Sequence, residues 1–169
     1  MKNLLVLITL IIAASTASFA QDTTSTSSEL PNLVVKNTDG ENVNIQTLAD
    51  GEHITIISFW ATWCKPCIKE LTNIQDLLED WNEEFNVRLI AISVDDSRNI
   101  SKVKPFAAGR GWNFDILLDP NGDVQRAMNV SNPPTTMIAD KHGKIVYLHT
   151  GYQEGDEYEI EDHLIELNK

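Results

Sequence analysis

The segment from Ile54 to Val94 constrains the fold of this chain more than any other part of the sequence. It opens with an unbroken apolar run, Ile54–Trp60, whose β-branched residues predict a strand buried on both faces. From residue 64 the apolar residues recur every three or four positions, which predicts a long helix, and Val87–Val94 predicts a second buried strand. A helix of this length between two strands implies a right-handed crossover and a parallel strand pair.

The rest of the sequence alternates short strands with helices. A turn signal at Asp39-Gly40, between two apolar stretches, predicts an N-terminal β-hairpin, and Asp140–Gly143 predicts a second hairpin. The order of elements predicts an α/β fold with a mixed central sheet that helices cover on both faces. The other predicted elements are a helix over Ser97–Arg110, a strand over Phe114–Leu118, a short helix over Asp123–Asn129, strands over Thr135–Ala139 and Lys144–Thr150, and a closing helix over Glu157–Leu167.

Residues 1–20 carry the pattern of a secretory signal peptide. Lys2 precedes an apolar run over Leu4–Ala14, and small residues at Ser18 and Ala20 form a cleavage site. The run is shorter than the roughly 20 residues that a membrane-spanning helix needs. We therefore predict cleavage after Ala20, a location in the periplasm or otherwise outside the cytosol, and no stable membrane insertion of the mature protein.

Residues 21–29 are polar and without periodicity, which predicts a flexible leader before a single folded domain over residues 30–169. The formal net charge of -12 argues against nucleic acid or an anionic membrane surface as the main partner. Two cysteines are too few for a disulfide-rich scaffold or for a zinc site made of cysteines alone.

Both cysteines lie where the first buried strand gives way to the long helix, in the sequence Cys64-Lys65-Pro66-Cys67. At this spacing the two sulfur atoms can close a small disulfide ring. The positive end of the helix dipole and its free N–H groups stabilise a thiolate on Cys64, and Lys65 adds a positive charge beside it. Pro66 suits the first turn of the helix, where it removes no hydrogen bond.

Two other roles for the cysteines carry less weight. A structural disulfide that closes so short a loop contributes little stability through chain entropy. A zinc site would need histidine ligands, and none of the four histidines has ligand spacing to the cysteines. We therefore expect neither a metal nor an organic cofactor, the redox group being the cysteine pair itself. The histidines in question are His53, His142, His149 and His163.

Two motifs resemble one protein family. The segment Phe59–Cys67 resembles the active-site sequence of thioredoxin-fold proteins, and more closely that of the extracytoplasmic TlpA/ResA branch. Glu70 matches a glutamate that this branch carries after its second cysteine, and Asn132–Asp140 resembles its cis-proline loop and following strand. The resemblance covers roughly residues 30–167, and it implies a thioredoxin fold and thiol–disulfide exchange.

The resemblance also implies roles for individual residues. Cys64 would attack a protein disulfide, Cys67 would resolve the mixed disulfide, and Glu70 would exchange protons with the pair. The implied function is reduction of protein disulfides, with apocytochrome c thiols as a candidate substrate class and a membrane-bound thiol protein as electron donor. The substrate groove would comprise Trp63, Lys65, Pro66, Pro133 and Pro134.

Three positions depart from the family pattern. Ser58 replaces a buried aspartate that moves protons in cytosolic thioredoxins, which leaves Glu70 as the candidate for that task. Helix geometry supports the choice, because Glu70 is the one acid that falls within the apolar arc of the predicted helix. Thr72 replaces a proline that often kinks this helix, so a straighter helix is expected. Pro133 has no N–H to donate to substrate backbone.

Two further functions stay open at this stage. A thiol peroxidase on the same fold would need a threonine and a proline just before its reactive cysteine, and only Thr62 is present here. A binding module that keeps the fold without catalysis is the other alternative. The sequence leaves the direction of electron flow open.

Overall fold

A computed structural model describes residues 29–169. The predicted signal peptide and the predicted leader up to residue 28 lie outside the described residues. Glu29 forms an isolated antiparallel bridge with Lys144, next to the hydrogen bond from the Leu30 N–H to the Gly143 carbonyl, 2.9 Å long. The described part of the chain therefore begins against the turn that joins β6 (Thr135–Ala139) to β7 (Ile145–Thr150).

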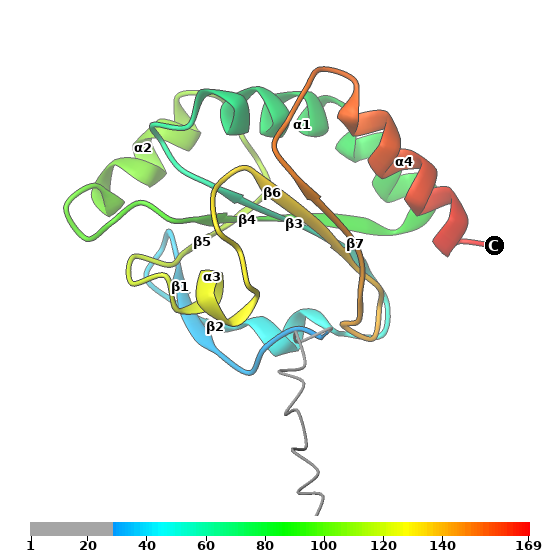
Figure 1. The fold of residues 1–169 in the computed structure, drawn as a ribbon, viewed down its shortest axis with the longest axis horizontal. Coiled ribbons are helices and arrows are strands. Elements are labelled where there is room, and N and C mark those ends of the chain that lie inside the picture. The colour runs from blue at the N-terminus through cyan, green and yellow to red at the C-terminus, as the bar shows by residue number, and fades with distance from the viewer. Residues whose placement is uncertain (1–28) are drawn as a thin grey trace, which may run out of the picture.

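Seven strands and four α-helices make up the domain (Figure 1). Strand β3 and helix α1 begin where the apolar run and the helical periodicity predict them. The strands are β1 (Val34–Asn37), β2 (Asn42–Asn44), β3 (Ile54–Trp60), β4 (Val87–Ser93), β5 (Asp115–Leu118), β6 (Thr135–Ala139) and β7 (Ile145–Thr150). The α-helices are α1 (Lys65–Phe85), α2 (Val103–Ala108), α3 (Asp123–Ala127) and α4 (Asp156–Leu167), with 3₁₀ turns η1 (Ile45–Leu48) and η2 (Ile100–Lys102).

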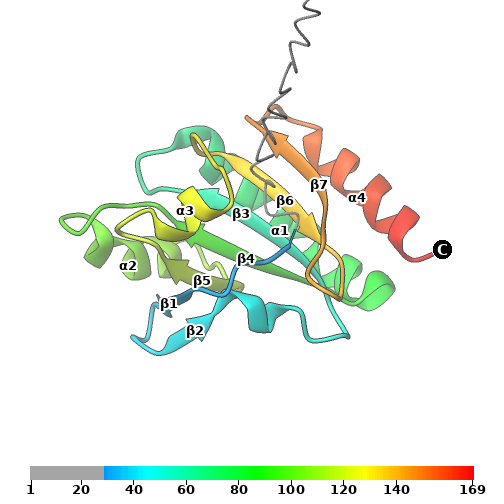
Figure 2. The same ribbon diagram turned by 60° about the horizontal axis from the view of Figure 1, so that its bottom comes forward.

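All seven strands form one mixed sheet in the order β2-β1-β5-β4-β3-β6-β7. Strand β4 runs parallel to both β3 and β5, which confirms the predicted crossover through α1. The pairs β1–β2, β1–β5, β3–β6 and β6–β7 are antiparallel. Figure 2 shows the β1–β2 hairpin at one edge of the sheet and β7, with α4 beside it, at the other. This is the predicted thioredoxin fold with an N-terminal hairpin.

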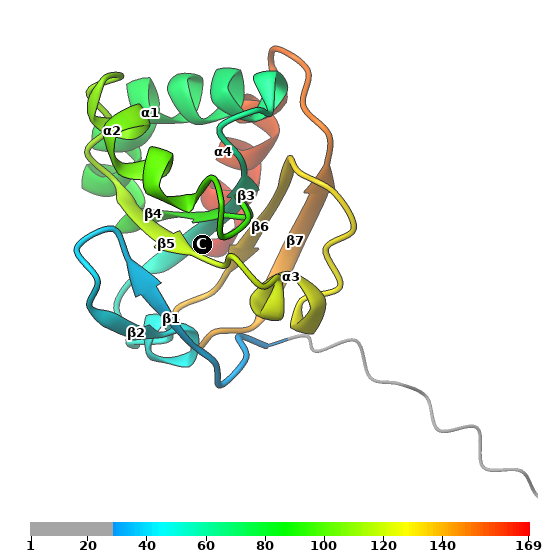
Figure 3. The same ribbon diagram turned by 90° about the vertical axis from the view of Figure 1, so that its left-hand side faces the viewer.

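Helices cover both faces of the sheet, but unequally (Figure 3). Helices α1, α2 and α4 lie on one face, over a core that includes Ile56 and Trp60. The shorter α3 and η1 lie on the other face, over a core that includes Ile57 and Phe59. Successive side chains of a strand point to opposite faces. Strand β3 therefore supplies both cores, which is why its whole length is buried.

One predicted helix is shorter than expected. The helix predicted over Ser97–Arg110 is instead η2 followed by the six residues of α2. The Asp96 carboxylate accepts hydrogen bonds from the backbone N–H groups of Arg98 and Asn99, both at 3.1 Å, and so holds a turn that competes with helix formation. Pro105 has no N–H and fits only the first turn of an α-helix, so α2 begins just before it.

Among the helices of residues 29–169, none combines the length and the apolar character needed to cross a membrane.

Candidate active site

The two cysteines are joined by a disulfide bond at the N-terminus of α1, with their Cα atoms 5.4 Å apart. Cys64 is the N-cap of the helix, and its Sγ accepts a hydrogen bond of 3.3 Å from the Cys67 N–H. Pro66 lies in the first turn, as predicted. Cys64 is 5% exposed and Cys67 is fully buried. An incoming thiol or disulfide therefore reaches Cys64 before Cys67.

The surface around Cys64 is formed by the loop before α1 and by the loop before β6. Trp63 is a large apolar side chain that is 63% exposed, and Lys65 and Pro66 are also exposed. The bond between Pro133 and Pro134 is cis, as the motif predicts. Because β6 pairs with β3 in the register Thr135 to Phe59, the cis-proline loop lies at the same edge of the sheet as the cysteines. The structure thus brings the predicted substrate residues to one edge.

Glu70 lies one helical turn beyond Cys67 and is only 2% exposed. The Ser58 hydroxyl donates to its Oε2 at 3.1 Å, and the Thr136 hydroxyl donates to its Oε1 at 2.7 Å. Ser58 and Thr136 face each other across β3 and β6, so the carboxylate rests on a pair of hydroxyls supplied by the sheet. The position of Glu70 within the apolar arc of α1 is therefore confirmed, and Ser58 has become a partner of this acid.

Burial raises the pKa of Glu70 to about 7, and the nearby Asp156 and Glu157 carboxylates raise it further, while the two hydroxyl donors oppose the shift. A carboxyl group with this pKa can take up and release a proton near neutral pH. Residues three apart on a helix are neighbours, so Glu70 and Cys67 share one buried region. The arrangement therefore places a carboxyl group that can exchange protons in the same buried region as the Cys67 sulfur.

A second buried acid supports the loop before the cysteines. Asp95 follows β4 and is fully buried, and its two oxygens accept hydrogen bonds from the Thr62 N–H at 2.8 Å and the Thr62 hydroxyl at 2.6 Å. The Ser93 hydroxyl donates to the same carboxylate at 3.0 Å. Sequence reasoning missed Asp95. Its place directly after a buried parallel strand, at the edge where functional loops gather, was the available signal.

Helix α1 is 21 residues long and runs without a break through Thr72, whose hydroxyl donates to the Ile68 carbonyl at 2.8 Å. The expectation of a straighter helix stays a prediction. Three of the histidines form pairs with acids, namely His53 with Asp50, His149 with Asp156 and His163 with Glu166, and His142 is exposed.

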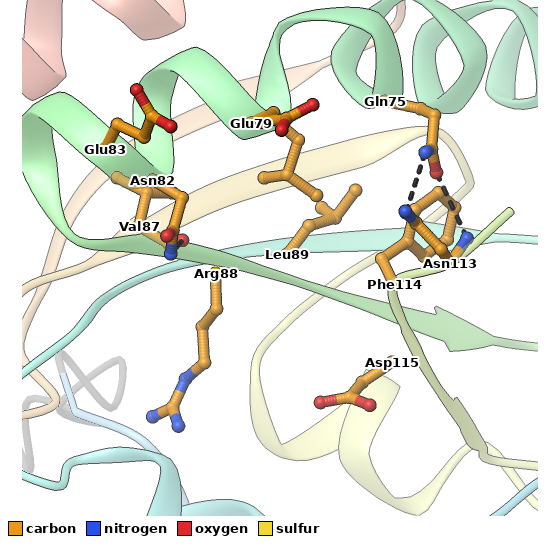
Figure 4. Close-up of a pocket in the computed structure, with 11 residues that line it drawn as sticks. Gln75, Glu79, Asn82, Glu83, Val87, Arg88, Leu89, Asn113, Phe114 and Asp115 are labelled. Atoms are coloured by element: carbon orange, nitrogen blue, oxygen red, sulfur yellow. Dashed lines mark hydrogen bonds between the residues drawn. The ribbon is translucent and has the colours of Figure 1, made fainter.

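A groove of about 570 Å³ lies toward the other end of α1 (Figure 4). Leu78, Val87 and Leu89 contribute apolar surface to it, and Gln75 bonds to Asn113 at one end, with an amide-to-carbonyl distance of 2.7 Å. Neither cysteine lines this groove, nor does Glu70. The redox chemistry is therefore located at the exposed N-terminal end of α1 and outside this groove.

Comparison with known proteins agrees with this site. A profile of the AhpC/TSA family matches residues 26–148. Over 131 residues the chain is 32% identical to the thiol-disulfide oxidoreductase ResA of Bacillus subtilis, covering 78% of this chain and 70% of that protein.

Two solved structures extend the comparison. The structure of a thioredoxin-like protein from Porphyromonas gingivalis shares 50% identity with a TM-score of 0.74, covering 82% of this chain and 91% of that one. A putative thiol:disulfide interchange protein DsbE from Chlorobium tepidum has the same fold at 22% identity and a TM-score of 0.71, covering 83% of this chain and 96% of that one. With its cysteine pair at the start of α1, the chain belongs to the AhpC/TSA family and, within it, to the ResA-like thiol–disulfide oxidoreductases of the thioredoxin fold.

Proposed function

We propose that this protein reduces disulfide bonds of other proteins outside the cytosol, by cycling between the dithiol and disulfide forms of Cys64 and Cys67. The observation that carries the proposal is the buried Glu70 one helical turn from a cysteine pair of which only Cys64 reaches the surface. No metal or organic cofactor takes part in the proposed cycle, because the two sulfur atoms carry both electrons.

The reaction starts with the Cys64 thiolate, which the N-terminus of α1 and Lys65 stabilise. It attacks one sulfur of the substrate disulfide, a mixed disulfide forms, and the first substrate thiolate leaves with the electron pair of the broken bond. Cys67 then gives its proton to Glu70. The Cys67 thiolate attacks the Cys64 sulfur, the Cys64–Cys67 bond forms, and the second substrate thiolate leaves. Two electrons have passed from the cysteine pair to the substrate.

The charge on Glu70 favours this direction. A dithiol/disulfide couple is a strong oxidant when its reduced form is stabilised, as happens when a thiolate is strongly favoured. Here a buried carboxylate close to Cys67 opposes formation of a thiolate, which makes the reduced pair a better electron donor. In the proposed cycle a membrane-bound thiol protein returns the electrons. Disulfides between the cysteines of apocytochrome c, which the reaction returns to thiols, are the substrate class that we propose.

Docking in this scheme uses the exposed surface around Cys64. Trp63 offers an exposed aromatic ring beside the reactive sulfur, a residue type that anchors many protein interfaces. Pro133 contributes a carbonyl group but no N–H donor to a substrate strand laid along the cis-proline loop. The proposed interface therefore depends more on apolar contact than on backbone pairing.

The reduction potential of the Cys64–Cys67 couple, measured by equilibration with glutathione, tests the proposal. A value near that of thioredoxin, about -270 mV, supports a reductant, and a value near about -120 mV would make the protein an oxidant. Full function in cells of a Cys64→Ser variant would instead favour a binding module without catalysis.

A thiol peroxidase is the weaker alternative. In the structure the Thr62 hydroxyl donates to Asp95, so it is directed into a buried network two residues before Cys64. An assay of hydrogen peroxide consumption by the reduced protein tests this alternative directly, and turnover comparable to its disulfide reduction would overturn our preference.

A further inference from the structure

The groove beside the second half of α1 lies over an open edge of the central sheet (Figure 4). Strand β4 pairs with β3 over its whole length, from Val87 to Ser93, but β5 joins β4 only from Ile90 onward, where Asp115 is its partner. The first three residues of β4, Val87–Leu89, therefore have no partner strand on this side within the described sheet. An open strand edge offers backbone N–H and C=O groups to an added strand.

Leu89 is the residue of this edge whose backbone faces the groove. On the β5 side of β4 the Ser93 carbonyl accepts from the Asp119 N–H at 2.9 Å, and alternate residues of a strand direct their backbone groups to the same side. Val87 has the same direction, but its carbonyl already accepts from the Asn82 side-chain amide at 2.7 Å. The N–H of Leu89 is therefore directed toward the open edge.

Apolar side chains form the floor of the groove. Val87 and Leu89 are buried in the core on the α1 face of the sheet, and Leu78 of α1 and Phe114, just before β5, pack against the same core while half-buried. All four line the groove, whose volume is about 570 Å³. The floor can therefore cover the aliphatic part of a bound side chain.

The rim of the groove is acidic. Glu79 and Glu83 of α1 line one side and Asp115 lines the other; all three are exposed, and none has an ion-pair partner within residues 29–169. Arg88 does not neutralise them, because its guanidinium points to the opposite side of β4 from Glu79 and Glu83, and its Nη1 lies 3.0 Å from Asp50 Oδ2 (Figure 4). The C-terminal end of α1 adds partial negative charge nearby.

We propose that this groove binds an extended, positively charged segment of a partner protein, which adds as a short strand to the open edge of β4. Lysine and arginine side chains fit both parts of the groove, because their aliphatic stems cover apolar surface while their charged groups reach the acidic rim. Neither cysteine lines the groove, so a partner can be held here while Cys64 exchanges disulfides. The inference goes beyond the proposed function and does not depend on the direction of electron flow.

Charge argues against two other occupants. The predicted leader over residues 21–28 contains neither lysine nor arginine. A second copy of the chain, with a formal net charge of -12, would bring like charges together. A basic segment of a different protein is therefore the occupant that complements the rim.

The test follows the ¹H–¹⁵N NMR spectrum of the oxidised protein while a synthetic peptide of alternating lysine and valine is added at low salt. We expect the largest shift changes at Val87–Leu89 and at residues 113–115, and weaker binding as the salt concentration rises. The double variant Glu83→Gln, Asp115→Asn should raise the Kd about four- to 25-fold, since each exposed ion pair contributes a factor of about two to five.

The double variant Asp76→Asn, Glu84→Gln is the matched control, because it removes one aspartate and one glutamate that are exposed on α1 but do not line the groove. It should leave the Kd nearly unchanged. The proposal is overturned if the two double variants weaken binding equally, if a peptide of alternating glutamate and valine binds as tightly, or if the largest shift changes lie outside the groove.

Two further results of the same experiment would assign the groove to another occupant and also overturn the proposal. Groove signals that move with protein concentration alone would indicate a second copy, and nuclear Overhauser contacts between residues 21–28 and Leu89 would indicate the leader. None of these measurements needs enzyme activity, so the proposal can fail while the proposed function holds, and the reverse.

Discussion

The buried carboxyl of Glu70 should make the stability of this protein fall as the pH rises, and replacing it should abolish that fall. Its pKa rises from 4.5 to about 7 in the folded protein, which corresponds to about 3 kcal/mol. Because the folded pKa is the higher one, folding favours the protonated form. The stabilisation is complete below pH 4.5 and is lost as the pH rises through about 7.

Glu70→Gln mimics the protonated form at every pH. We expect it to unfold in urea much like the wild type at pH 4.5, and to be more stable at pH 8.5 by about 1 to 3 kcal/mol, the lower figure allowing for a less favourable fit of the amide to the Ser58 and Thr136 hydroxyls. The measurement uses the oxidised proteins, so the disulfide is constant. Glu79→Gln, at an exposed acid on the same helix, is the control.

The same variant should change the chemistry of the reduced protein. Without the carboxylate, the apparent pKa of the Cys64 thiol should fall, and the proton-dependent attack of Cys67 on a mixed disulfide should slow. Thiolate absorbance near 240 nm against pH measures the first effect, and single-turnover kinetics measure the second. Parallel stability profiles and superimposable thiolate curves for the variant and wild type would refute the reasoning and leave Glu70 without a role in proton exchange.

Four further predictions concern the cysteines and their supporting loops. Brief iodoacetamide treatment of the reduced protein should label Cys64 before Cys67, as mass mapping would show, because Cys64 is the more exposed and lies at the helix N-terminus. Cys67→Ser should accumulate mixed disulfides with substrates on non-reducing gels, and accumulation by Cys64→Ser instead would reverse their roles. Asp95→Ala should lower the free energy of unfolding by about 3 kcal/mol and slow disulfide exchange, because it leaves the two partly buried Thr62 donors without an acceptor. Pro133→Thr restores a backbone N–H and should lower the KM for a protein substrate, which steady-state kinetics can measure.

Local pattern was sufficient for the parts of the fold that are made of consecutive residues. The apolar run of β3 and the helical period of α1 predict both elements, because burial on two faces and on one face leave different periods in a sequence. The same period predicts that Glu70 lies within the apolar arc of α1, and the structure shows it buried there. The contact of Glu70 with Thr136 could not be predicted from local pattern, because the register that brings β6 to β3 depends on contacts between residues far apart in the chain.

Two features could not be predicted from the sequence, the late start of α2 and the role of Asp95, because both depend on side-chain contacts. Asp96 ends no strand and starts no helix in the sequence pattern, yet its side chain holds a turn that delays α2. Only the parallel arrangement of β3 and β4 places Asp95 under the loop that carries Thr62.

The grip of Asp95 on Thr62 has a consequence for how partners distinguish the two redox forms. Asp95 follows β4, and its bonds to Thr62 involve neither sulfur atom, so we expect them to persist when the disulfide is opened. The loop that carries Trp63 should then have the same conformation in the dithiol and disulfide forms of the protein. Substrate and electron donor would bind the same surface. The protein would discriminate between them by charge and by the redox state of the sulfur atoms, and not by a change of shape.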